Sequence, residues 1–152
     1  MRLSKPMQRR HAMPVSDDFA KLTAQVEEAE LRIKEAAAEG HAEAETKVDE
    51  ARQKADAHAA EQRDKPQEAD RDDGWQQIRS DWDRHVQRTR ERIDAKKAKV
   101  DADVAESDAE WAEADAYDAI DFAASAILEA EYVVLDAVGT RKKADVLAAR
   151  QR

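Results

Sequence analysis

The sequence contains no cysteine, only three glycines and three prolines, and few aromatic residues, which make up 5% of its 152 positions. The absence of cysteine excludes disulfide bonds, thiolate metal sites and thiol catalysis. The shortage of glycine, proline and ring side chains is typical of long helices or coiled coils rather than of a thick globular core. No apolar run of about 18 residues free of charge occurs, so no membrane-spanning helix is expected.

The N-terminal residues 1–15 lack both acidic side chains and the apolar segment of an export signal. They contain four basic residues together with Pro6 and Pro14, and they show no helical periodicity. The pair Arg9-Arg10 is not followed by an apolar stretch, so it does not match a twin-arginine export signal. We therefore expect a mobile basic arm and a cytoplasmic location.

Charged residues are abundant, at 40% of the chain, and they are segregated along it. Between Val100 and Thr140 the sequence has twelve acidic residues and no lysine or arginine, whereas residues 141–152 carry a net charge of +4. The total is −9. Phosphate binding needs a sustained basic face, so nucleic acid is not expected as a partner. The short basic segments are better explained as complements to the acidic one.

Apolar residues at spacings of three and four predict a first long helix over residues 16–64. Ser16 is a suitable N-cap, and the acidic residues that follow it favour the positive end of a helix dipole. The apolar seam begins with Phe19, Leu22, Val26, Ala29, Ile33 and Ala36. Gly40 is a weak point in this helix, and Pro66 requires it to end near Asp64.

A second long helix is predicted over residues 75–138, after a turn at residues 65–74. No proline follows the turn, and no glycine interrupts residues 75–138. Gly139 can end or bend this helix, and residues 141–152 form a basic helical tail. Two long helices joined by a short connection pack antiparallel. The expected fold is all-α: a long antiparallel helical hairpin, or coiled coil.

The segment over residues 116–138 is both acidic and the most apolar part of the chain. If the turn is centred near residue 70, the first helix covers the second only to about residue 124, and the rest overhangs. Apolar side chains cover more than half of the helical circumference here, which is typical of a helix packed on more than one side. We therefore expect self-association, as a dimer in which the C-terminal segments of two chains complete a helical bundle.

The expected association surface is the bulky apolar face of residues 116–138. Its members are Tyr117, Ile120, Ile127, Leu128, Glu131, Val134, Leu135 and Val138. Glu131 lies near the centre of this face, where a charge is costly unless it is paired. It could bind a cation or set specificity, but pairing with a basic residue of the tail or of the arm is the favoured interpretation.

The acidic and histidine residues do not match a known cofactor site. None of the four histidines has a glutamate three residues before it, so spacing excludes a di-iron carboxylate bundle. Asp81, His85 and His58 could together hold zinc, although histidines at a coiled-coil margin are usually solvated or paired. The acidic turn at residues 70–74 has glycine in the fifth position rather than the sixth of a calcium loop. We expect no metal, no cofactor and no catalysis.

Residues 118–138, DAIDFAASAILEAEYVVLDAV, resemble the C-terminal part of alanine-rich coiled-coil proteins of actinobacteria, which have no known activity. The resemblance implies a coiled coil and carries no activity. Gly74 and Trp75 at the turn, with Tyr132 and Asp136 four residues apart, are also similar to small secreted helical hairpins of the WXG type. The order Gly-Trp departs from the Trp-x-Gly of that family.

The sequence as a whole predicts a non-enzymatic structural or protein-interaction protein that self-associates through residues 116–138. The main alternative is a peripheral membrane-surface binder that uses the same apolar face as an interfacial helix. Such helices usually carry lysine and arginine on their polar face, which the acidic segment lacks. A secreted hairpin of the WXG type is a further alternative.

Overall fold

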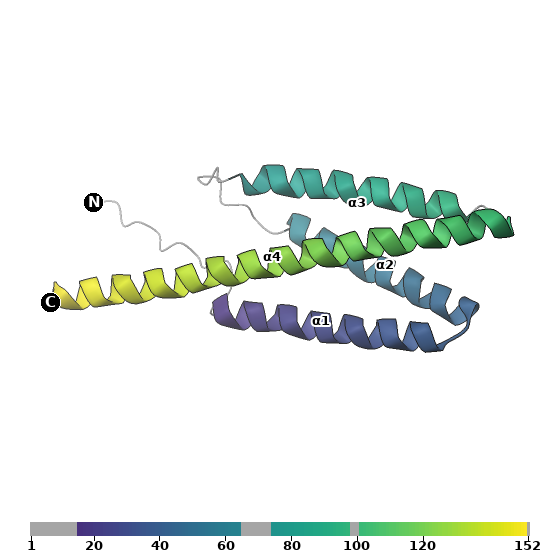
Figure 1. Cartoon of the computed structure of the whole chain (residues 1–152). Helices are drawn as coiled ribbons and strands as arrows, with labels where there is room; N and C mark the ends of the chain where they lie inside the picture. Colours follow the sequence, from purple (N-terminus) through teal and green to yellow (C-terminus); the bar gives the residue numbers. More distant parts are fainter. Residues whose placement is uncertain (1–14, 65–73, 98–100, 152) are drawn as a thin grey trace. The chain divides into compact units, whose positions relative to one another are not determined.

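A computed structural model describes residues 15–64, 74–97 and 101–151. All regular structure in these ranges is α-helical, which confirms the all-α prediction. The helices are α1 (Val15–Ala38), α2 (His41–Asp64), α3 (Trp75–Lys97) and α4 (Ala102–Arg150) (Figure 1). The predicted basic arm, residues 1–15, lies outside the described residues except for Val15, the first residue of α1.

The predicted continuous first helix, residues 16–64, is two helices in the structure, separated by Glu39 and Gly40. The Glu39 N–H donates to the Ala36 carbonyl at 3.3 Å and closes α1. The Gly40 carbonyl accepts from the Ala44 N–H at 3.0 Å and opens α2. Glycine is a poor helix former because ordering its backbone costs more entropy than for other residues, so the chain leaves the helix here.

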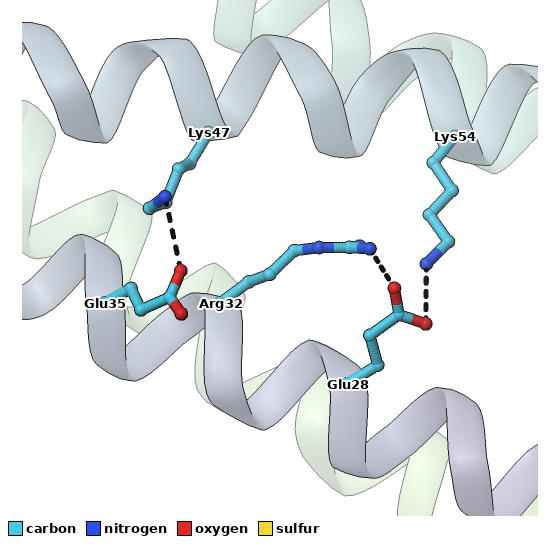
Figure 2. A network of polar contacts seen from close by, with 5 residues as sticks. All are labelled: Glu28, Arg32, Glu35, Lys47 and Lys54. Carbon is cyan, nitrogen blue, oxygen red and sulfur yellow. Dashed lines mark hydrogen bonds and ion pairs between the residues drawn. The ribbon is translucent and has the colours of Figure 1, made fainter.

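α1 and α2 run antiparallel and are joined by ion pairs (Figure 2). Lys47 Nζ lies 3.3 Å from Glu35 Oε2, and Lys54 Nζ lies 3.1 Å from Glu28 Oε2. The two lysines are seven residues apart on α2, and the two glutamates are seven residues apart on α1. These contacts therefore repeat once per heptad, with the two helices running in opposite directions.

The apolar seam predicted for the first helix is only partly covered. Phe19, Leu22 and Ala36 are half-buried. Val26 and Ile33, by contrast, remain 49% and 68% exposed. No side chain in the described ranges is fully buried. Helix pairing within one chain therefore leaves much apolar surface uncovered.

α3 begins directly after Gly74, the last residue of the predicted turn at residues 65–74. Gly74 has a φ of +84°, in the left-handed region that glycine adopts without steric cost. Its carbonyl accepts from the Ile78 N–H at 3.2 Å and so starts the helix. The rest of the predicted turn, residues 65–73, lies outside the described residues.

The predicted second helix, residues 75–138, is also two helices: α3 ends at Lys97 and α4 begins at Ala102. Asp101 caps α4, because its Oδ1 accepts from the Asp103 N–H at 3.0 Å. The first N–H groups of a helix have no partner within it, and an aspartate side chain satisfies one of them. Basic residues in the last turn of α3 and an acidic residue in the first turn of α4 suit the two helix dipoles.

α4 contains 49 residues and continues without interruption through Gly139 to Arg150 (Figure 1). At 1.5 Å per residue, its length is about 74 Å. Gly139, where the sequence leaves an end or a bend open, lies inside α4, and the described part of the predicted tail at residues 141–152 forms the last turns of this helix. One glycine costs about 1 kcal/mol in a helix, and the 49-residue α4 tolerates that cost.

The described residues group into two units by their contacts. Of the described residues, the first unit contains 15–57 and 124–151, and the second unit contains 58–64, 74–97 and 101–123. α4 contributes to both units, because the boundary falls after residue 123. The predicted association residues are thus divided: Tyr117 and Ile120 belong to the second unit, and the other six belong to the first.

In the second unit, α3 packs against the N-terminal half of α4. Trp82 stacks on Phe122, with ring centroids 5.6 Å apart and 10° between the ring planes. Arg92 of α3 forms an ion pair with Asp115 of α4 at 3.8 Å. The contacts of Figure 2 join α1 with α2, and the contacts described here join α3 with α4. Both sets join helices that are neighbours in the sequence. The expected hairpin would instead pair two long helices.

Candidate association surface

The structure divides the predicted association surface on α4 into a partly covered side and an exposed side. Ile127 and Val134 are half-buried in the first unit, together with Ala130. Leu128 and Leu135 remain 64% and 62% exposed. Although these pairs are adjacent in the sequence, consecutive residues of a helix point about 100° apart, so the two pairs lie on different sides.

The remaining predicted residues are also exposed to different degrees. In the second unit, Tyr117 and Ile120 are 70% and 62% exposed. In the first unit, Val138 is 37% exposed, and Glu131 is exposed as well. The Glu131 carboxylate is therefore solvated in the single chain, and a charge at this position becomes costly only when a partner covers it.

An exposed stripe runs along α4 in the first unit, at alternating spacings of four and three residues. The residues of this exposed stripe are Leu128, Tyr132, Leu135, Gly139, Lys142, Val146 and Ala149. Tyr132 and Val146, which are not among the predicted association residues, are 72% and 51% exposed. The spacing is that with which a helix meets a partner helix. The same spacing continues across Gly139. A helix that ended at Gly139 would not show this longer stripe.

The best defined polar cluster of the first unit lies between α1 and α2 (Figure 2). The Glu28 carboxylate accepts from Lys54 across the helix pair and from Arg32 one turn along α1. The hydrogen bond from Lys54 lowers the pKa of Glu28, and the positive charges of Arg32 and Lys54 lower it further. The charged form of Glu28 therefore favours the pairing of α1 with α2.

A second part of this cluster is centred on Lys47. Its ammonium group lies 3.3 Å from Glu35 and 3.5 Å from Glu39. The hydrogen bond to Glu35 raises the pKa of Lys47, and the negative charge of Glu39 acts in the same direction. All the acidic members are exposed, so the cluster sets the register of a helix pair and does not form a site for a reacting group.

The predicted zinc ligands are not brought together. The Asp81 carboxylate accepts from Arg84 and from Gln77 Nε2, the latter at 3.0 Å. The His85 ring lies beside Trp82, with centroids 5.6 Å apart. Within the part of the chain that the structure describes, no three histidine, cysteine, aspartate or glutamate residues assemble as a metal site.

A shallow depression of about 560 Å³ lies on α3 in the second unit. It is lined by His85, Arg88, Glu91, Arg92 and Ala95. All five residues come from one helix, whereas ligand sites are concave and cover most of their ligand. The depression therefore does not define a small-molecule site.

Among the described helices, none has both the length and the apolar character that crossing a membrane requires. The candidate functional features of the described residues are the apolar and charged faces of the helices. No model of a known protein family matches this chain, and no curated protein or solved structure matches it either.

Proposed function

We propose that this chain is a non-enzymatic coiled-coil protein that associates with a second copy of itself through α4. The observation that carries the proposal is the exposed stripe. Three of its large side chains, Leu128, Tyr132 and Leu135, are 64%, 72% and 62% exposed on one side of a continuous helix. A contiguous exposed apolar patch of this kind is typical of an interaction site.

Covering the exposed stripe is energetically favourable. Burying one leucine side chain fully contributes about 2 kcal/mol relative to leaving it exposed. Two identical copies meet through the same patch, so a two-fold interface gains each contribution twice. The half-buried positions Ile127 and Val134 face the other side of α4, which supports packing of this helix on two sides.

Glu131 lies beside the exposed stripe and would be covered in part by a second copy. A covered carboxylate destabilises an interface unless a cation pairs with it. The same helix carries such cations toward its C-terminal end, among them Arg150. A second copy therefore brings its own counter-charges, which favours self-association over an apolar partner.

Sedimentation velocity tests the proposal on the full chain. The unchanged protein should sediment as a dimer, and Leu135→Asp should shift it to a monomer, because an unpaired charge in an apolar interface is costly. Ala137→Asp introduces the same charge at an exposed position on the side of α4 opposite the exposed stripe, and it should leave the dimer intact. A monomeric unchanged protein, or equal effects of the two substitutions, would contradict the proposal.

A second candidate function is binding to a membrane surface through the same helix. It is favoured by the end of α4, where Val146 and Leu147 are 51% and 46% exposed beside several basic residues. Interfacial helices combine apolar and basic faces in this way. Flotation with anionic phosphatidylserine vesicles at low salt separates the two functions, since binding that salt reverses would support this one and absence of binding would remove it.

A further inference from the structure

A regular series of charges runs along one edge of the exposed stripe. It consists of Glu129, Asp136, Lys143 and Arg150, all of them exposed and each seven residues after the one before. Every member directly follows a residue of the stripe, so all four lie on the same side of it, where the side chains of a partner helix come within reach. The order is two acids followed by two bases.

This order distinguishes the two ways in which a second copy can pack on α4. In a parallel arrangement, the turns that carry Glu129 and Asp136 lie beside the same turns of the second copy, so acids meet acids and bases meet bases. In an antiparallel arrangement, the second helix runs in the opposite direction, so its bases lie beside the acids of the first helix and its acids beside the bases. Charges at these flanking positions set the orientation of helix pairs, because like charges side by side are destabilising.

We infer that the second copy packs antiparallel on α4, with a two-fold axis that crosses the helix just after Gly139. This inference rests on the proposed self-association. Glu129 then faces Arg150 of the second copy, and Asp136 faces Lys143 of the second copy. Two-fold symmetry repeats both contacts, so four ion pairs line the interface.

The apolar side chains of the exposed stripe fit to within two residues, or about 3 Å along the axis, of the register that the charges define. Leu135 comes next to Val146 of the second copy, which buries two side chains that are 62% and 51% exposed in the single chain. Gly139 likewise comes next to Lys142 of the second copy. Nothing lies within 4 Å of the position that a Cβ on Gly139 would take, so there is room for the methylene stem of the lysine.

Distance measurements between spin labels test the orientation, because the chain has no cysteine of its own. A label on Ser125→Cys, at an exposed position, reports its separation from the same label on the second copy. In the antiparallel register the two sites are about 29 residues apart along the helix axis, or about 44 Å. In a parallel pair they are roughly 10 Å apart, the spacing of packed helices.

A separation near 44 Å is the expected result. A short separation in a dimeric sample would overturn the antiparallel assignment and leave the proposed self-association standing. A monomeric mass without coupling between labels would overturn both. The two failures are therefore distinguishable in one sample.

Charge exchange provides an independent test of the pairing. Lys143→Glu should weaken self-association about tenfold at low salt, because it sets two like-charge contacts against Asp136. Adding Asp136→Lys restores opposite charges and should recover most of the affinity. Lys34→Glu on α1 makes the same change in net charge and should have little effect. An affinity that is not recovered in the double variant would overturn the pairing.

Discussion

Trp82 of α3 stacks on Phe122 of α4, with the ring centroids 5.6 Å apart and an interplanar angle of 10°. Both rings remain about half exposed, at 48% and 59%. The stack joins two helices that contribute no buried residue. It is an apolar contact between α3 and α4, and the second unit should be sensitive to its loss.

Replacing Phe122 by alanine should lower the free energy of unfolding by about 1–2 kcal/mol, because both burial and ring stacking are lost. Urea unfolding followed by circular dichroism measures the change. Trp111, which is 67% exposed in the same unit, provides a control, and its replacement by alanine should cost less. A double variant with Trp82→Ala should show a coupling of about 0.5–1.5 kcal/mol. Additive effects would show that the rings do not stabilise each other.

The ion pair between Glu28 and Lys54 should make the α1–α2 pair sensitive to acid. The pKa of Glu28 is lowered from 4.5, first by the hydrogen bond from Lys54. A lowered pKa in the folded state means that the stabilisation is complete above the unfolded value and is lost as the pH falls through the folded value. Lys54→Gln should move the Glu28 pKa upward in an NMR titration. Lys34→Gln should instead raise the pKa of Glu30, whose main partner is Lys34, and leave that of Glu28 unchanged.

Gly139→Ala should stabilise α4 by about 1 kcal/mol, because glycine loses more backbone entropy than alanine on entering a helix. In the single chain nothing lies within 4 Å of the added methyl group. Thermal unfolding measures the gain. Gly74→Ala is a matched contrast: its φ of +84° disfavours alanine, so this substitution should destabilise. A loss of stability in Gly139→Ala would instead show that a partner lies close against this glycine.

Asp101→Ala should cost about 1 kcal/mol, because it removes the hydrogen bond to the Asp103 N–H that starts α4. Asp101→Asn keeps an oxygen acceptor at the cap and should retain most of the stability. The difference between the two variants, measured by thermal unfolding, separates capping from the loss of a charge. Equal destabilisation by both variants would assign the effect to the charge near the helix dipole.

The sequence was sufficient to predict an all-α chain, because helix periodicity and the scarcity of breakers act locally. The two breaks in the long helices are not predicted by the sequence, for different reasons. Gly40 is a helix breaker, but its position within an apolar seam indicates a weak point inside one helix. Between residues 75 and 101 there is no glycine or proline, and the signal is electrostatic: lysines 96 and 97 suit a helix end, and an aspartate cap suits a helix start.

The division of the candidate surface could not be predicted from the sequence. A helical wheel shows which residues share a side of α4, but not which side a neighbouring helix covers. Which side is covered depends on how the other helices pair. The expected hairpin pairs two long helices, whereas in the structure α1 and α2 are separate helices that pair with each other. Ile127 and Leu128 are adjacent, and yet Ile127 is half-buried and Leu128 is 64% exposed.

α4 keeps its helical form although none of its residues is buried. Its acidic residues lie mainly toward the N-terminal end, and Arg141, Lys142, Lys143 and Arg150 lie toward the C-terminal end. Those charges near the helix ends oppose the helix macrodipole, which is positive at the N-terminus and negative at the C-terminus, and they stabilise the helix. In the proposed self-association, a helix that is formed before its partner arrives loses little conformational freedom on binding, so α4 would bind without coupled folding.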